Sequence, residues 1–153
     1  MTEIRAVTSD EFPRFEPLFV AYQEFYEVEQ ISRERNREFF SRFLGDEEGS
    51  ASTDGWLLGA FDGEEPVGFG CFYRHKSSLT ATDIVLMNDL YVTEATRGQG
   101  TGRALIDAGV ELARGWGASH LSWATAPDNH TAQRLYDATG AHQSTWLEYE
   151  IEV

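Results

Sequence analysis

The sequence predicts an α/β fold in which helices flank one mixed sheet. The chain has 153 residues and is 41% hydrophobic, which suits a single domain over residues 1–153 with a core of its own. Apolar residues in the first third recur every three or four positions, as in helices, and residues 55–92 follow strand patterns. The last third alternates between helical and strand-like segments. Together these three observations favour a mixed sheet covered by helices.

The N-terminal segment predicts a short strand over residues 3–7, followed by a helix. Thr8 and Glu11 have the spacing of a capping box, which marks a helix start. Pro13 and Pro17 should kink or break the first turns, because proline lacks the amide N–H that a helix needs. The apolar face of this helix comprises Phe12, Phe15, Leu18, Phe19, Tyr22, Phe25 and Tyr26.

A second helix is predicted over residues 32–44, and Gly45 provides its C-terminal stop. The apolar face of this second helix comprises Phe39, Phe40, Phe43 and Leu44. Residues 46–54 then form a polar loop before the strand patterns begin.

Three consecutive strands follow that loop. Residues 56–61 and 67–75 are expected to form a hairpin around a turn at residues 62–66. Residues 84–92 are apolar at both ends, which is typical of a strand buried on both faces. We therefore expect residues 84–92 to lie centrally in the sheet.

The C-terminal third predicts a helix over residues 101–114 and a strand over residues 120–125, which ends before the break at Pro127. A helix over residues 129–139 and a final strand over residues 146–151 complete the order. No internal repeat, linker or low-complexity segment interrupts this order.

The chain is strongly acidic, with 26 Asp and Glu residues against 12 Lys and Arg, for a formal net charge of −14. This charge repels phosphate backbones, so nucleic acid is not expected as a main partner. Lys76 is the only lysine, and the other basic residues are arginines. A loss of lysine throughout the chain favours a halophilic adaptation. Attraction of a cationic substrate is the alternative explanation of the acidic composition.

Cys71 is the only cysteine and lies in an apolar run, so we expect buried packing and no disulfide. No apolar stretch approaches the ~20 residues of a membrane span, and the first residues lack the apolar core of a signal peptide. We therefore expect no membrane association and a cytoplasmic location. The histidines show no metal-ligand spacing and predict no metal site; they are His75, His120, His130 and His142.

Residues 97–103 read Arg-Gly-Gln-Gly-Thr-Gly-Arg and lie between the expected central strand and an amphipathic helix. Amide N–H groups and the helix dipole bind anions at such a position, and glycines let a ligand approach the backbone closely. The alternative is that the glycines only allow the chain to turn between the strand and the helix. A Walker A loop is excluded because no Gly-Lys-Ser or Gly-Lys-Thr follows. The G-x-G-x-G spacing also differs from the G-x-G-x-x-G of dinucleotide folds.

In these residues the chain resembles the GNAT superfamily of acyl-CoA-dependent N-acyltransferases. Arg97, Gly100 and Gly102 fill its R/Q-x-x-G-x-G/A signature, and Asp-Leu-Tyr-Val at residues 89–92 precedes it as in the family. A second motif, N-x-x-A-x-x-L-Y-x-x-x-G, is filled by Asn129, Ala132, Leu135, Tyr136 and Gly140. The resemblance implies a GNAT fold, with a mostly antiparallel sheet splayed at the acyl-CoA site, and acetyl-CoA as co-substrate.

The resemblance also implies which residues contact the cofactor. The amides of residues 98–103 would take the CoA pyrophosphate, the exposed main chain of residues 90–92 would pair with the pantetheine in the manner of an added strand, and Asn129 would contact the cofactor. The expected cofactor-binding residues are Leu90, Tyr91, Val92, Arg97, Gly98, Gln99, Gly100, Thr101, Gly102, Arg103, Asn129 and Ala132.

Two catalytic candidates follow from the same resemblance. Tyr136 matches a tyrosine that lies near the thioester sulfur in the family. Its O–H can protonate the departing CoA thiolate, whose conjugate thiol has a pKa of about 8.5. The alternative is that Tyr136 only packs in the core. Asp89 is the nearest carboxylate that could deprotonate the amine, with a structural role as the alternative. A water held by Asn88 and a glutamate from the first helices are the other candidate bases. The branch of small diamine and polyamine acetyltransferases, which the chain resembles most, has a glutamate before this aspartate, whereas this chain has Asn88. Strand alternation sends Asn88 and Asp89 to opposite faces unless a bulge intervenes.

The acceptor site implied by the resemblance lies at the first helices, where aromatic residues and carboxylates alternate. Its expected residues are Tyr22, Phe25, Tyr26, Glu27 and Asn88. Such a set suits a cation, so we expect a small polyamine-like or diamino acceptor, with simple core packing as the alternative. Acylation of a protein or peptide amine and a non-catalytic CoA sensor remain as rival functions. A homodimer through the C-terminal strands is also expected from the family.

Overall fold

The computed structural model describes residues 2–45 and 51–153, and it places five strands in one sheet in the order β1-β2-β3-β4-β5. The first four strands pair antiparallel, and β5 pairs parallel with β4. The fold class predicted from the sequence is therefore confirmed. The strands are β1 (Thr2–Ala6), β2 (Gly55–Asp62), β3 (Glu65–Ser77), β4 (Thr82–Val92) and β5 (Leu121–Ser122).

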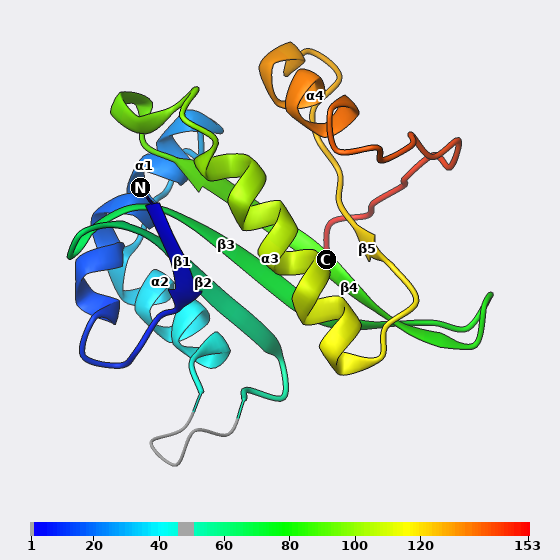
Figure 1. The fold of residues 1–153 in the computed structure, drawn as a ribbon, viewed down its shortest axis with the longest axis horizontal. Helices are drawn as coiled ribbons and strands as arrows, with labels where there is room; N and C mark the ends of the chain where they lie inside the picture. The colour runs from blue at the N-terminus through cyan, green and yellow to red at the C-terminus, as the bar shows by residue number, and fades with distance from the viewer. Residues whose placement is uncertain (1, 46–50) are drawn as a thin grey trace.

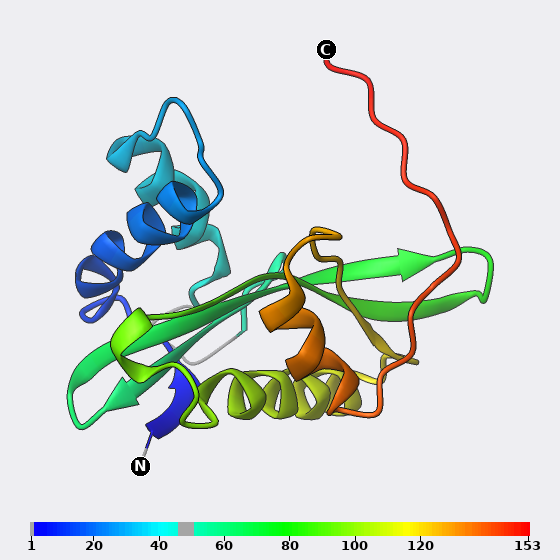
Figure 2. The ribbon, with the colours of Figure 1, turned by 90° about the horizontal axis from the view of Figure 1, so that it is seen from above.

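The helices form a layer on each face of this sheet (Figure 1, Figure 2). Helices α1 and α2 cover one face, and the long α3 runs across the other, whereas the chain's last residues run toward the side of α1 and α2. In the described ranges no helix is both long and apolar enough to cross a membrane. The helices are α1 (Glu16–Phe25), α2 (Arg33–Phe40), α3 (Thr101–Trp116) and α4 (His130–Asp137), with 3-10 turns η1 (Phe12–Phe15), η2 (Ser41–Phe43) and η3 (Glu94–Thr96).

The sheet buries an apolar core on each face, because successive residues of a strand point to opposite sides. The core beneath α1 and α2 is aromatic: the rings of Phe19 and Phe40 stack at a centroid distance of 4.0 Å, and Phe69 of β3 meets Phe19 edge to face at 5.0 Å. The core beneath α3 is mostly aliphatic, and Phe72 is the aromatic residue among its buried members. Strand β4 lies between β3 and β5, as expected for residues 84–92.

The helix predicted to start near Thr8 starts later, because helical structure begins at Phe12 with a 3-10 turn and α1 begins at Glu16. Thr8 and Glu11 nevertheless contact each other as a capping pair. The Glu11 carboxylate accepts the Thr8 backbone N–H at 3.2 Å and its hydroxyl at 2.9 Å. A hydrogen bond from Arg5 lowers the pKa of Glu11 to about 2. Pro13 lies in the 3-10 turn η1 and Pro17 in the first turn of α1. The prolines therefore break the segment at its first turns, as predicted.

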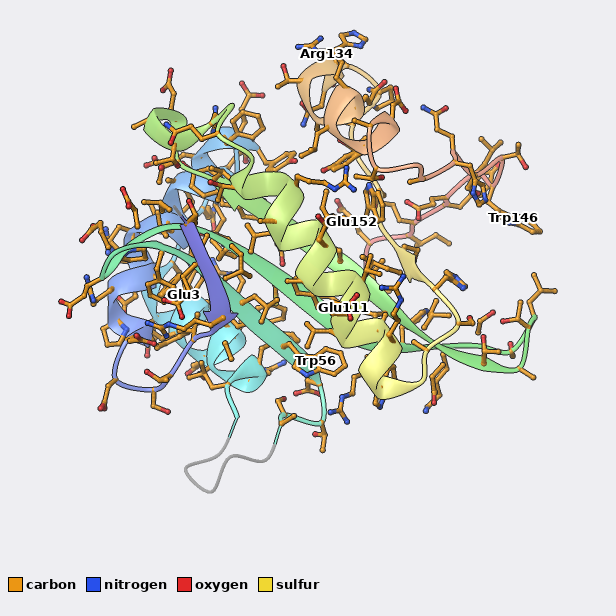
Figure 3. All side chains as sticks on the ribbon, in the orientation of Figure 1. Glu3, Trp56, Glu111, Arg134, Trp146 and Glu152 are labelled. Carbon is orange, nitrogen blue, oxygen red and sulfur yellow. The ribbon has the colours of Figure 1, made fainter. Side chains whose placement is uncertain are left out.

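The expected final strand over residues 146–151 is wrong, because residues 141–153 form no strand and run away from the body as an extended tail (Figure 2). The strand-like pattern is present, yet a strand also needs a hydrogen-bonding partner, and β5 has only two residues instead of the six expected over 120–125. Trp146 is 79% exposed and projects from this tail (Figure 3). Leu147, Tyr149, Ile151 and Val153 are exposed as well.

The β3–β4 hairpin extends beyond the helices and carries the single lysine of the chain. Lys76 Nζ lies 3.2 Å from Asp83 Oδ1, and 84% of the Lys76 side chain is exposed. Such solvent-exposed ion pairs contribute about 0–1 kcal/mol, so this pair adds little to the stability of the hairpin.

Candidate active site

A β-bulge in β4 lets two neighbouring polar residues face the same side of the sheet. Asp89 pairs with Cys71 of β3, whereas the next pair along is Met87 with Phe72, so Asn88 is the extra residue. Such an extra residue re-aims side chains. Asn88 and Asp89 were expected to face opposite sides unless a bulge intervened. The bulge is present, and both residues line one cavity.

This cavity has a volume of about 430 Å³ and lies between α1, α2 and the sheet. Helix α1 contributes Tyr22, β3 contributes Tyr73, and β4 contributes Asn88 and Asp89. The complete lining consists of Tyr22, Gln23, Val28, Gln30, Ser32, Arg35, Asn36, Phe39, Phe40, Tyr73, Asn88 and Asp89. Its size suits a small-molecule ligand.

Asp89 is the buried carboxylate of this cavity, with 5% of its surface exposed. Its Oδ1 accepts a hydrogen bond from the Asn88 amide at 3.1 Å, whereas Oδ2 has no partner among the described residues. Burial raises the pKa of Asp89, and hydrogen bonding from Tyr22 and Asn88 opposes that rise. A carboxylate with an uncommitted oxygen can accept a proton or hydrogen bond from a ligand.

Two tyrosines surround this carboxylate and remain protonated at neutral pH. Burial, followed by the negative charge of Asp89, raises the pKa of both Tyr22 and Tyr73 well above the usual value. The phenol rings therefore present neutral hydroxyl donors to the cavity. Tyr22 also contacts Tyr26 edge to face, at a centroid distance of 5.1 Å.

An amide pair joins the two helices that roof the cavity. Gln23 of α1 and Asn36 of α2 exchange two hydrogen bonds, each 2.8 Å long. Asn36 is only 5% exposed, and a buried amide needs such partners. Neither residue was predicted from the sequence as part of the site, although Asn36 lies one helical turn before the buried Phe40 and is a polar position on the buried face of α2.

Strand β4 has an open edge beyond the bulge. Strand β5 pairs only with Val85 and Leu86, so residues 87–92 have no strand partner on that side within the described ranges. Leu90 and Val92 pack toward α3 and α4, whereas Tyr91 packs toward α1 and lies 6.3 Å from the ring of Tyr22. The unpaired main chain can therefore receive an extended ligand by strand addition.

The glycine loop ends at the N-terminus of α3. Gly98 and Gly100 have φ of +76° and +88°, a backbone conformation that favours glycine, and a Cβ at either position would meet nothing within 4 Å. No backbone N–H of residues 98–103 donates to another described atom, and the first amide bonded within the helix is that of Ala104. These free donors and the helix dipole form an anion site.

The side chains of this loop are engaged elsewhere, which leaves its backbone to face a ligand. Arg97 Nε donates to the Val92 carbonyl at 2.9 Å, and Gln99 donates to the Ala95 carbonyl at 3.3 Å. The Thr101 hydroxyl is buried against that of Thr2. Arg103 ties α3 to α4: it pairs with Asp107 at 2.9 Å and donates to the Ala138 carbonyl at 3.1 Å.

Helix α4 places Tyr136 beside the open edge. Asn129 caps this helix by accepting the Ala132 N–H at 3.3 Å, so its side chain has a structural task there. Tyr136 meets Trp123 edge to face at a centroid distance of 5.3 Å. Burial, with a smaller contribution from the nearby Tyr26, raises the pKa of Tyr136 to about 12. Its hydroxyl therefore carries a proton at neutral pH.

The acceptor residues expected from the sequence divide into two groups. Tyr22 and Asn88 lie with Asp89 in the cavity, whereas Phe25, Tyr26 and Glu27 are absent from its lining and lie at the C-terminal end of α1. The ring of Phe25 is 52% exposed and lies 5.6 Å from the guanidinium of Arg97. The structure thus brings three of the expected acceptor and catalytic residues together on the cavity wall.

The chain was compared with protein families and with known proteins. The model of the acetyltransferase (GNAT) family matches residues 14–141. The chain is 41% identical over 83 residues to the D-amino-acid N-acetyltransferase HPA3 of Saccharomyces cerevisiae, and 40% identical over 78 residues to a thialysine N-epsilon-acetyltransferase of Caenorhabditis elegans. These matches span 53% and 51% of the chain but only 52% and 48% of the relatives, about half of their length.

Two further comparisons extend over nearly the whole chain. The uncharacterized N-acetyltransferase YhfO of Bacillus subtilis is 30% identical over 142 residues, covering 93% of this chain and 91% of that protein. A crystal structure of a probable acetyltransferase superposes with a TM-score of 0.84 at 27% identity, over 99% of this chain and 97% of that one. The match of the family model, the glycine loop and the open strand edge agree, and the chain belongs to the acetyltransferase (GNAT) family.

Proposed function

We propose that this acetyltransferase moves an acetyl group from acetyl-CoA directly to a primary amine of a small polyamine-like or diamino compound. The observation that carries the proposal is the placement of Asp89, whose uncommitted oxygen lies in a ligand-sized cavity on the same strand that leaves its edge open. The relatives named as N-acetyltransferases of D-amino acids and of thialysine support an amine acceptor.

The residues at the open edge fit acetyl-CoA. The amides of residues 98–103 would hold its diphosphate, and the main chain of residues 90–92 would pair with its pantetheine amides. Acetyl-CoA supplies an acetyl group activated as a thioester. The donor set is suitable because it is made of N–H groups that lack protein partners in the described chain.

Starting from the ammonium form, the reaction requires two protons to leave the nitrogen and one to reach the sulfur. A primary amine with a pKa of about 10.4 is neutral in only about one molecule in 2,500 at pH 7, so a base assists it. Asp89 accepts one proton of the ammonium, either directly or through a water held by Asn88, and passes it to solvent. The neutral amine nitrogen then forms a C–N bond with the acetyl carbonyl carbon as the C–S bond breaks, and Asp89 accepts the second N–H proton. Tyr136 donates its hydroxyl proton to the departing thiolate and regains one from solvent.

Replacing Tyr136 with Phe should lower kcat by about tenfold or more, because the thiolate then departs without a proton donor. CoA affinity should stay nearly unchanged, since the ring and its packing on Trp123 remain. Steady-state kinetics and calorimetric titration with CoA measure the two effects separately. Tyr149→Phe, which removes an exposed hydroxyl from the tail, is the matched control. An unchanged kcat in Tyr136→Phe removes Tyr136 from the role of acid.

The experiment that tests the function is release of free thiol from acetyl-CoA over a panel of acceptors. The panel contains spermidine, diaminopropane, lysine, an aminoglycoside and a lysine-rich peptide, each in low and in molar KCl. Turnover of small amines establishes the proposed reaction, and turnover of the peptide alone favours a protein acceptor. Binding of CoA without turnover of any acceptor favours a sensor. Activity that needs molar KCl supports the halophilic explanation of the net charge of −14.

We also propose that the tail over residues 141–153 is covered by a second copy of the chain. Four large apolar side chains of this tail are each at least 79% exposed (Trp146, Leu147, Tyr149 and Ile151), and an exposed apolar stretch of this kind marks an interaction site. The short β5 leaves an edge where a partner's tail can pair.

Light scattering in molar KCl should therefore give the mass of a dimer for the unaltered chain. Replacing Trp146, Tyr149 and Ile151 together with Ser should give a monomer that still binds CoA. Leu79→Ser, which removes an 81% exposed apolar side chain from the β3–β4 hairpin, should leave the dimer intact. A monomeric unaltered chain, or a dimer that survives the triple substitution, contradicts this assembly.

A further inference from the structure

The cavity that contains Asp89 holds one negative and one positive side chain. Asp89 lies on the sheet, and Arg35 lies on α2 at the opposite wall; none of the other lining residues carries a formal charge at neutral pH. A diamine or polyamine brings two or more positive charges and no negative one. Such a ligand would gain from a second carboxylate and would be repelled by a guanidinium. The charges of the cavity instead match a ligand with one charge of each sign.

Arg35 is available to a ligand. Its side chain donates one hydrogen bond, from Nη2 to the Gln30 carbonyl at 3.1 Å, and it pairs with no carboxylate in the described ranges. The nearby Arg37 on the same helix, by contrast, pairs with Glu16 at 3.4 Å. A guanidinium has five N–H donors in a planar fork that matches a carboxylate. The contact with Gln30 orients this fork and leaves most of its donors free.

The surrounding structure sets the position of Arg35 relative to Asp89. Arg35 precedes Asn36, whose amide pair with Gln23 joins α2 to α1. Gln23 in turn follows Tyr22, which lines the same cavity as Asp89. The backbone N–H of Arg35 is also held, because it donates to the helix-capping oxygen of Ser32 at 3.3 Å. The helix that carries Arg35 is therefore joined by hydrogen bonds to α1, which lines the cavity beside Asp89.

We propose that the acceptor is an amino acid or a similar zwitterion, with its carboxylate bound by Arg35 and its reacting amine placed at Asp89. This inference rests on the proposed acetyl transfer and changes its acceptor from a polycation to an amine that also carries a carboxylate. Arg35 acts as a specificity-determining residue, because a carboxylate on the acceptor adds a charge-assisted, two-point contact that a plain diamine lacks. Asp89 receives the amine at its uncommitted oxygen.

Matched acceptors test this assignment without any change to the enzyme. Lysine, lysinamide and cadaverine differ only at one carbon, which carries a carboxylate, a carboxamide or a hydrogen, respectively. Alanine, alaninamide and ethylamine form the same series for acceptors with a single amine. The unaltered enzyme should prefer the carboxylate member of at least one series by about tenfold or more in kcat/KM. Equal or better use of cadaverine and ethylamine overturns the proposal.

Substitution of Arg35 tests the residue itself. Arg35→Gln should raise KM for the carboxylate acceptor by about tenfold or more and remove the preference, while kcat/KM for cadaverine does not fall, because the guanidinium that repels this dication is removed. Arg35→Lys should retain part of the preference, since it keeps the charge but loses the fork. Arg33→Gln removes the same charge from the same helix outside the cavity and should keep the full preference. A preference that persists in Arg35→Gln overturns the assignment.

Direct binding separates failure of this inference from failure of the proposed reaction. Calorimetry with lysine, lysinamide and cadaverine in the presence of CoA needs no turnover. Carboxylate-dependent binding that is lost in Arg35→Gln, with no thiol release from any acceptor, upholds the zwitterion site and overturns the acetyl transfer. Thiol release without any dependence on the carboxylate upholds the transfer and overturns the zwitterion site.

Discussion

Asp89→Asn should lower kcat/KM by about a hundredfold or more, because the amide can neither accept a proton from the amine nor attract its positive charge. The same substitution should raise the melting temperature. Asn is nearly isosteric with Asp, and its carbonyl can still accept the hydrogen bond from Asn88. The variant removes a buried carboxylate that has one oxygen without a partner, which relieves a desolvation cost. Loss of activity with gain of stability is the pattern expected of a functional group rather than of a structural one.

The gain in stability should depend on pH with a defined sign. Burial raises the pKa of Asp89 in the folded protein above its unfolded value, so the folded chain binds the proton more tightly. The stability of the unaltered protein therefore falls as pH rises from about 3.9 through the folded pKa. The Asp89→Asn variant does not lose stability in this way, because it has no ionisable carboxyl group at this position. The difference in melting temperature should thus be full above the folded pKa and vanish below about pH 3.9.

Thermal unfolding from pH 3 to 8 and steady-state kinetics measure the two effects of Asp89→Asn. Asp83→Asn is the matched control, because Asp83 lies on the same strand but is partly exposed and paired with Lys76. This control should keep kcat/KM and should not raise the melting temperature. Full activity in Asp89→Asn, or a fall in its melting temperature at neutral pH, assigns Asp89 to structure instead.

Gly100→Glu should abolish binding of CoA. The substitution places a carboxylate at the N-terminus of α3, where free N–H groups and the helix dipole receive an anion. A side chain at φ of +88° also adds strain of about 1–2 kcal/mol. Gly100→Gln carries the same strain and nearly the same volume without the charge, so it should weaken binding far less. Calorimetric titration with CoA measures both.

Gly117→Glu separates a local effect from a general one. Gly117 ends the same helix, has φ of +79°, and a Cβ there meets nothing within 4 Å. The variant therefore adds the same charge and similar strain at the opposite end of α3, and it should bind CoA normally. Normal binding by Gly100→Glu, or equal loss in both variants, contradicts the anion site at the loop.

The fold was largely predictable because its signals are local. The change from helical to strand periodicity at Gly55 depends on neighbouring residues, and β2 begins at Gly55. The capping pair Thr8–Glu11 is also local, and its hydrogen bonds form, although the helical segment begins only at Phe12. The tail over residues 141–153 shows the limit of such signals. Its alternation predicts a strand, but pairing depends on a partner elsewhere in space, which a local pattern does not encode.

The parts of the candidate site that belong to a sequence motif could be predicted. The parts that depend on how helices and strands pack together could not. The glycines at 98 and 100 are visible as a motif, and the structure gives both the left-handed conformation. The bulge at Asn88 depends on how β3 and β4 pair, so alternation alone could not reveal it. Arg35 looks like any exposed arginine of a polar helix, and only the packing of α2 beside the sheet brings it to the wall of the cavity.

The lone lysine at the β3–β4 hairpin has a chemical consequence for an enzyme that handles thioesters. Free amines on a protein surface react slowly with thioesters, so a lysine-rich acetyltransferase can acylate itself. Here the lysine side chains offer one such amine, that of Lys76 beside Asp83, whereas the guanidinium groups of the arginines are not nucleophiles. The basic residues of this chain therefore add almost nothing to the pool of competing acceptors.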